Sequence, residues 1–426
     1  MNSGFNFSLE YWSKYLRNSD LPPVVRWVIV IIFLVSLTYI FPKVFLYKVS
    51  DCEDFKQFWI AGKIWLLFKD AYGPAYLDFA REHFSQCGKL APWLYPPAWY
   101  LPSVLSATIN LATATYIWKI VSLALVILSC LFISLSLDKY FAKNLIFAFF
   151  MIASFAMLLQ WTNHTIYSGQ TPILPFFGAS LLTYGYNKKR PTYSVLGFLI
   201  LSFKPQIGVI YYLVLFFFSP LRKQVILGGI VVALLSIPAL LMQFEYGPTT
   251  VLVHFVKNAS TFADYEVNRP LLTTGIRNIW YRMVGYDIGS FAGLALGSLA
   301  AVAFGVAANR IASEKDEIFF KSIIGATAIC LVFNSLHIYD HVIALIFPIW
   351  ILLGLPYGWS ALFALLIIFR AGNVAHWFVA HVSETYFYGM RMVLLTSASI
   401  LLLIGIVAGL SKKWPNTNLE IKKINK

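Results

Sequence analysis

The sequence predicts an all-α polytopic membrane protein, built as a single integral domain over residues 1–426. Hydrophobic residues make up 59% of the chain, charged residues make up only 12%, and the mean hydropathy is +0.70. No soluble domain has this balance, and the apolar residues come in repeated long runs, as helical spans of about 20 residues require. The net charge of +14 is dispersed between these runs, so it indicates topology and lipid contact rather than nucleic-acid binding.

The apolar runs, taken in chain order, are the candidate spans. The segment before them, 1–25, is too polar for a signal peptide, so we expect a cytoplasmic N-terminus followed by a retained first span. The basic tail 411–426 is expected in the cytoplasm as well. The runs lie at about 26–47, 111–136, 144–160, 171–186, 193–218, 225–243, 289–309, 318–336, 341–355, 359–372 and 392–410.

Lysine and arginine in the short connections set the predicted orientation, because cytoplasmic connections are enriched in both. Lys188-Lys189-Arg190 precedes the run 193–218 and Arg222-Lys223 follows it, so one span there would put two basic connections on opposite sides. A hairpin of two short helices that turns at Lys204-Pro205 removes this conflict, because proline breaks a helix. With this hairpin, we expect about twelve spans and cytoplasmic termini.

Unusual polar residues then collect on the opposite, extracytoplasmic face. A layer of long connections with convergent charge predicts an active or binding site above a helical bundle. The first long connection also carries Phe58-Trp59-Ile60 and Ile64-Trp65-Leu66-Leu67, which are typical of helices lying along a membrane surface. The polar set is Asp51, Glu53, Asp54, Tyr95, His164, Gln170, Lys204, Asn268-Arg269-Pro270, Arg277, His337, Asp340, His341 and His376.

The acidic cluster in the first long connection is the leading candidate for catalysis. A carboxylate at an outer cavity can act as general base on a hydroxyl nucleophile. Asp51 and Glu53 would raise the pKa of Asp54 by like-charge repulsion if they point the same way. The residues alone do not separate Asp51 from Asp54, and the alternative is that the cluster only marks the membrane exit.

Cationic residues on the same face are candidates for binding phosphate. Lys204 lies in an apolar run, where it needs an anion such as a lipid-linked phosphate, or else snorkels to the interface. Arg269 and Arg277 can hold phosphate in fork geometry. The alternative for these arginines is a structural ion pair with Asp264 or Glu266.

Aromatic residues and histidines complete the candidate set. Tyr95-Pro96-Pro97 is a rigid aromatic turn that suits a sugar ring or a lipid chain, although interfacial belts have the same composition. His337 and His341 have the i, i+4 spacing of a metal pair on a helix, but no third ligand is evident nearby. We therefore expect them to bind sugar hydroxyls or phosphate, or to be structural.

The cysteines divide by their surroundings. Cys130 and Cys330 lie within apolar runs and are expected in the core. Cys52 and Cys87 share the first long connection, and they can form a disulfide if that connection faces an oxidising compartment.

Taken in order, these pieces resemble the membrane glycosyltransferase family GT87, the polyprenyl-phosphate-mannose-dependent group also called DUF2029. The likeness covers roughly residues 50–350. The doubled histidine expected at His341 is missing, and the segment 268–277 matches no motif of the family. The matching pieces are Asp54-Phe55, Tyr72, Tyr76-Leu77-Asp78, Tyr95-Pro96-Pro97, Gly169-Gln170, Gly197, Phe203-Lys204-Pro205 and Tyr339-Asp340-His341-Val342.

The resemblance implies a GT-C fold in the plasma (inner) membrane, with its active site on the extracytoplasmic side. It implies inverting transfer of a sugar, usually mannose, from a polyprenyl-phosphate donor to a hydroxyl of a glycan or glycolipid, and it selects Asp54 as the base. No cofactor is expected, with a divalent metal as the alternative. The residues expected to bind substrate are Asp51, Tyr95, His164, Gln170, Lys204, Arg269, Arg277, His337 and His341.

Two other classes stay open at this point. A lipid-linked oligosaccharide transporter or ligase also uses outer-face arginines and many helices, but it does not need a lone base in the first outer connection. A solute transporter would place polar residues at mid-membrane on broken, repeated helices. The chain shows no such repeat, and it has no P-loop, Rossmann glycine pattern or GxSxG motif that would indicate a soluble nucleotide-sugar fold.

Overall fold

Every regular element in the described part of the protein is a helix, and an isolated β-bridge joins Thr274 to Leu336. This confirms the predicted all-α class. The predicted base neighbour Asp51 and the tail 411–426 lie outside the described residues. The computed structural model describes residues 20–46, 50, 52–87, 90–141, 143–243, 245–263, 265, 268–311, 315–348, 362–364, 366–368 and 384–410.

Long apolar helices make this a membrane protein. Among the described residues, five helices are long and apolar enough to cross a bilayer, and a sixth span results if α8 (Leu145–Leu158) and α9 (Gln160–Ser168), bent by 63°, count as one. The expected bundle of about twelve spans stays a prediction, since much of 341–355 and 359–372 is not described. The five helices are α2 (Pro23–Phe45), α6 (Leu111–Ser136), α13 (Arg222–Leu241), α16 (Ser290–Ile311) and α20 (Glu384–Gly409).

The bundle is completed by shorter apolar helices. The helices α10 (Ile173–Asn187) and α17 (Lys315–Phe333) pack among the long ones and contribute to a continuous apolar core. The described part of the predicted run at 341–355 is not an α-helix. It belongs to η6 (Ile338–Ile346), a 3-10 helix.

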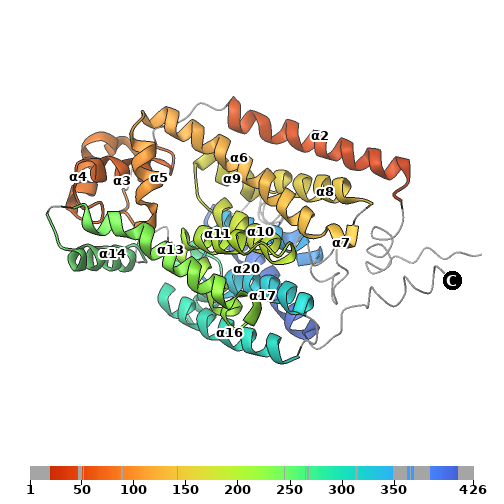
Figure 1. Cartoon of the computed structure of the whole chain (residues 1–426). Coiled ribbons are helices and arrows are strands. Elements are labelled where there is room, and N and C mark those ends of the chain that lie inside the picture. The colour runs from red at the N-terminus through yellow and green to blue at the C-terminus, as the bar shows by residue number, and fades with distance from the viewer. Residues whose placement is uncertain are drawn as a thin grey trace, which may run out of the picture.

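A layer of short helices covers one end of the bundle, on the left in Figure 1, opposite the short helix α7 (Asp138–Phe141). The segment expected to lie along the membrane surface forms the helix α3 (Lys56–Leu66), whose side chains Phe58, Ile60, Ile64 and Trp65 are buried within the protein. Its position along a membrane stays a prediction. These side chains join a second apolar core that is rich in tryptophan and tyrosine and separate from that of the bundle. The layer consists of α3 (Lys56–Leu66), α4 (Pro74–Phe84), α5 (Tyr100–Ala107) and α14 (Pro248–Ala263).

The run 193–218 folds back on itself, as predicted. It forms α11 (Pro191–Ser202) and α12 (Pro205–Phe216), with Lys204 and Phe203 between them. The rings of Phe198 and Tyr212 are 5.0 Å apart, although fourteen residues of straight helix would separate them by about 21 Å. The turn can be this tight because a Cβ at Gly208 would lie 2.7 Å from the carbonyl oxygen of Leu201, so only glycine fits.

The disulfide that the sequence left open is formed. Cys52, just before α3, is bonded to Cys87 in η1 (Ser85–Cys87), with the two Cα atoms 5.1 Å apart. Cys130 and Cys330 are buried free thiols, as expected. The disulfide ties the start of the covering layer to the end of α4.

The hairpin predicts that the connections before α11 and after α12 lie on the same side of the membrane. Arg190→Cys and Arg222→Cys place thiols at exposed positions next to these two helices. We expect a membrane-impermeant maleimide to label both positions from one side only, and the same side for both. Labelling of the two positions from opposite sides would show that 193–218 crosses the membrane once.

Candidate functional site

Segments far apart in the sequence meet beneath the covering layer. The segment before α3 contacts the loop after α9, and the turn between α11 and α12 contacts the start of η6. The motif around Tyr95 reaches the same turn through Trp99, whose Nε1 donates to the carbonyl oxygen of Phe203 at 3.0 Å. The predicted site residues on these segments therefore form one cluster, centred on Asp54, Tyr95, Gln170, Lys204 and His337.

Asp54 is held by the loop that contains Gly169 and Gln170. The amide Nε2 of Gln170 donates to Oδ2 of Asp54 at 2.6 Å, and the backbone N–H of Asp54 donates to Ser168 at 2.9 Å. Gly169 has φ of 71°, and a Cβ there would lie 2.8 Å from the Cβ of Phe55, so glycine is required. Within the described residues, the half-buried carboxylate of Asp54 accepts this one hydrogen bond and forms no ion pair, which leaves it able to take a proton.

Tyr95 forms an aromatic wall beside Asp54. Its ring lies 4.4 Å from that of Phe58 and 5.8 Å from that of Trp99, and its carbonyl oxygen accepts a hydrogen bond from the hydroxyl of Tyr72 at 2.7 Å. Burial raises the pKa of Tyr95, and the negative charges of Asp54 and Asp340 raise it further. The phenol therefore stays protonated and is a hydrogen-bond donor at neutral pH.

Lys204 has a protein partner that the sequence did not reveal. Its Nζ forms an ion pair with Oδ1 of Asp340, and the two residues are only 5% and 2% exposed. The second oxygen, Oδ2 of Asp340, accepts the backbone N–H of His337 at 3.0 Å. The Nζ also lies 5.5 Å from the ring centroid of Tyr339. The pair fixes the hairpin turn to the start of η6.

Two of the histidines, His337 and His164, lie near the ring of Tyr339, and the third, His341, is buried. The ring of Tyr339 lies 5.2 Å from that of His337 and 5.9 Å from that of the exposed His164. Burial lowers the pKa of His337, against the opposing effect of Asp340, so it is a neutral hydrogen-bonding group at neutral pH. His341 is fully buried, with Nδ1 at 3.2 Å from the carbonyl oxygen of Ile338.

The helix assumed for the i, i+4 histidine pair is not present. The element is the 3-10 helix η6, and His337 is its N-cap with an extended backbone. With three residues per turn, His337 and His341 do not share one face. No group of three or more potential metal ligands occurs among the described residues.

Arg277 forms hydrogen bonds and an ion pair within the protein. Its guanidinium forks onto Asp287 at 2.7 and 2.6 Å, and it also donates to the carbonyl oxygen of Asn268 at 2.7 Å and to Ser290 at 2.6 Å. These bonds lower the pKa of the Asp287 carboxyl. Of the two expectations, the structural ion pair is the one seen, although Asp264 and Glu266, the partners considered, lie outside the described residues.

Arg269 differs from Arg277 in its surroundings. It is exposed and immediately precedes η5 (Pro270–Leu272). Exposure therefore distinguishes Arg269 from Arg277, which is only 4% exposed.

Lys119, and the pairing of Asp340 with Lys204, were not predicted from the sequence. Lys119 from α6 forms an ion pair with Glu53, 2.8 Å from Nζ to Oε1, and Asp340 neutralises Lys204. The signal for Lys119 was a lone lysine inside a long apolar run. The signal for Asp340 was the need of Lys204 for an anion, but its position in the chain could not be inferred from that need.

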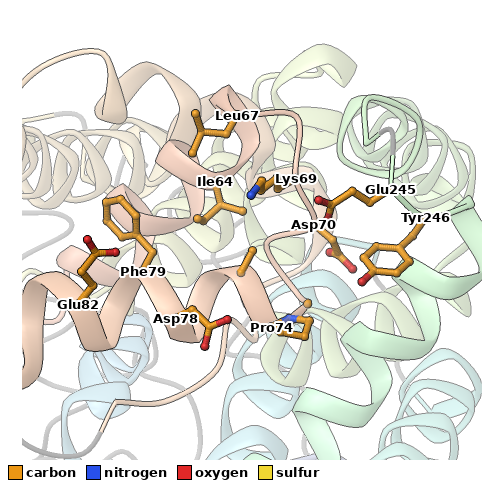
Figure 2. Close-up of a pocket in the computed structure, with 12 residues that line it drawn as sticks. Ile64, Leu67, Lys69, Asp70, Pro74, Asp78, Phe79, Glu82, Glu245 and Tyr246 are labelled. Carbon is orange, nitrogen blue, oxygen red and sulfur yellow. The ribbon is translucent and has the colours of Figure 1, made fainter.

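A pocket of about 350 Å³ lies elsewhere in the covering layer, between α3, α4 and the start of α14 (Figure 2). Its lining contains Asp70, Asp78, Glu82 and Glu245 together with Lys69. None of the predicted site residues lines it. The buried Asp70 has a protein partner, because its Oδ2 lies 2.7 Å from Nδ1 of His254.

Comparison with known proteins adds no relative. No family model matches the chain, and no curated protein matches it. Any assignment of function therefore depends on the geometry of the site and on the order of the motifs.

The ion pair between Lys204 and Asp340 predicts a large and specific loss of stability. Lys204→Met leaves the carboxylate of Asp340 buried without its cation, which we expect to cost about 3–5 kcal/mol of unfolding free energy. Lys69→Met removes an exposed lysine and should change stability by less than about 0.5 kcal/mol. Denaturant unfolding of the purified protein in detergent measures both variants, and equal effects would show that the pair is not a stabilising contact.

Proposed function

We propose that this protein is an inverting membrane glycosyltransferase of the GT-C type. It would transfer a sugar, mannose by the motif resemblance, from a polyprenyl-phosphate donor to a hydroxyl of a glycan or glycolipid. The supporting observation is that the separate motifs come together around one carboxylate, Asp54, that forms no ion pair among the described residues. Asp54, Tyr95, Gln170 and Lys204 belong to four of the motifs that carry the resemblance.

In this proposal Asp54 is the general base. Its carboxylate takes the proton of the acceptor hydroxyl while the acceptor oxygen forms its bond to the anomeric carbon of the donor. The bond from that carbon to the phosphate oxygen breaks, and the electron pair leaves with the lipid phosphate. Gln170 orients the carboxylate by its hydrogen bond to Oδ2 and leaves the other oxygen for the acceptor.

The donor phosphate would be bound by Lys204 and Arg269. An ammonium group has three donors, and Asp340 takes one of them, so Lys204 can still donate to a phosphate oxygen. Tyr95 and Tyr339 offer aromatic faces beside the two charges for a sugar ring. The proposed reaction uses no cofactor, and a divalent metal bound at the phosphate is the alternative. It involves no nucleic acid.

The side of the membrane is proposed from covalent and charge observations. The disulfide between Cys52 and Cys87 belongs to an oxidising compartment. The covering layer and α7, which is followed by the basic Lys143, lie at opposite ends of the bundle (Figure 1). Both observations favour a site on the extracytoplasmic side, and the plasma (inner) membrane is what the motif resemblance implies.

The base assignment predicts that Asp54→Asn abolishes sugar transfer without loss of folded protein. An amide keeps the shape of the side chain but cannot accept the hydroxyl proton, and loss of a positioned base costs about 10²–10⁴-fold in rate. The assay is transfer of label from radiolabelled polyprenyl-phosphate-mannose in membranes with and without the protein. Glu82→Gln, at an exposed carboxylate of the same layer that belongs to none of the motifs, is the control and should keep full turnover.

Other outcomes of this assay have defined meanings. Asp51→Asn should cost less than Asp54→Asn, and the reverse order would make Asp51 the base. If both variants keep normal turnover, the acidic cluster is only a membrane-exit marker. If the wild-type protein transfers no sugar but moves or joins lipid-linked oligosaccharides, the transporter or ligase alternative replaces the proposal.

The donor assignment predicts a change in binding rather than in chemistry. Arg269→Gln removes an exposed guanidinium, so the fold should persist while the KM for the donor rises about tenfold or more, as expected for a charge-assisted hydrogen bond to phosphate. The kcat at saturating donor should not change. A variant with the wild-type donor KM would remove Arg269 from the phosphate site.

A further inference from the structure

A buried lysine in α6 lies outside every motif considered above. Lys119 is 0% exposed and is located in a helix that is apolar enough to cross the membrane. Its Nζ donates to Oε1 of Glu53 at 2.8 Å and lies 5.4 Å from the ring centroid of Tyr167. A charge in such a helix is costly and normally marks a functional requirement.

Stability does not account for the pair that Lys119 forms. Glu53 is 8% exposed, and its Oε2 is buried with no hydrogen-bond partner among the described residues. A buried ion pair with an unsatisfied oxygen is commonly no more stable than an apolar pair of the same volume. The presence of this ion pair therefore needs an explanation other than stability.

The position of Glu53 in the chain gives that account. Its neighbour Cys52 is bonded to Cys87 at the end of α4, and the backbone N–H of its other neighbour, Asp54, donates to Ser168 at the end of α9. Glu53 itself is attached to α6 by Lys119. Successive residues are thus fixed to different elements of the fold.

Of these attachments, only that of Glu53 is an ion pair with a long helix of the bundle. Oε1 of Glu53 also accepts the backbone N–H of Ser50 at 3.1 Å, so the carboxylate closes its own turn as well. The turn precedes α3 directly, and Asp54 follows Glu53 within it. A shift of Glu53 relative to α6 would therefore move Asp54 relative to Gln170.

We propose that Lys119 and Glu53 form a positioning pair that holds Asp54 against Gln170 in the reactive arrangement. This inference rests on the proposed role of Asp54 as base. Neither member of the pair touches substrate in this scheme. The same contact neutralises Glu53, so its charge is balanced by Lys119 rather than directed at Asp54.

The test replaces the pair as a unit. The double variant Glu53→Leu with Lys119→Met fills the space with apolar side chains, and we expect it to fold with a Tm no lower than that of the wild type. Its kcat should fall about 10²-fold, because a displacement of about 1 Å at a reacting group can cost that much, while the donor KM stays unchanged. A double variant with wild-type kcat overturns the proposal.

Two further variants separate positioning from general damage. Glu53→Lys with Lys119→Glu rebuilds the pair in reverse and should recover part of the lost kcat, which a merely structural loss would not do. Asp138→Leu with Lys188→Met removes another ion pair, at the opposite end of α6, and should leave kcat unchanged. Equal losses in the apolar double variant and in this control would also overturn the proposal.

A readout that needs no activity separates this inference from the proposed function. Hydrogen–deuterium exchange of the peptide that contains residues 52–57 reports on the segment that carries Asp54. We expect faster exchange there in the apolar double variant and no change in α16. If the wild type transfers no sugar, faster exchange still supports the positioning of this segment, and unchanged exchange overturns it.

Discussion

A charge inside an apolar bundle needs an opposite charge, and the candidate site depends on how this requirement is met. Lys119 is paired with Glu53, Lys204 with Asp340 and Arg277 with Asp287. The first two pairs join segments that are far apart in the chain, so they fix the covering layer to α6 and the hairpin turn to the start of η6, whereas the third closes a local segment. In a medium of low dielectric constant, these contacts cannot slip to other partners without leaving a charge unpaired.

Apolar packing also fixes the covering layer to the bundle. The second core places Phe55, Phe58, Trp93 and Trp99 between the covering layer and the bundle. Aromatic side chains bury large areas and have few rotatable bonds, so they fix the position of the covering layer relative to the bundle. The result is a carboxylate, Asp54, that is surrounded by aromatic side chains and that forms no ion pair among the described residues.

Much of the fold could be predicted because its signals are local. The run 111–136 coincides with α6, because a long apolar run predicts a helical span and Asn110 caps its first turn. The turn at Lys204 could be inferred from basic connections on both sides of one run. The disulfide was left open because its formation depends on compartment as well as on spacing.

The contacts of the site could not be predicted in the same way. Lys204 and Asp340 are 136 residues apart, and a need for an anion does not tell which carboxylate supplies it. Lys119 was passed over because its helix is otherwise a clear apolar span. His337 and His341 were placed on an α-helix by their spacing, whereas the backbone forms a 3-10 helix whose period differs.

The disulfide between Cys52 and Cys87 also sets an order of events in biosynthesis. Both cysteines precede the other parts of the site, so the bond can close as soon as the first long connection reaches an oxidising compartment. Lys119, Gln170, Lys204 and Asp340 follow in that order along the chain. The carboxylate of Asp54 is therefore anchored first and surrounded last, and a partly synthesised chain carries this carboxylate without the residues that later surround it.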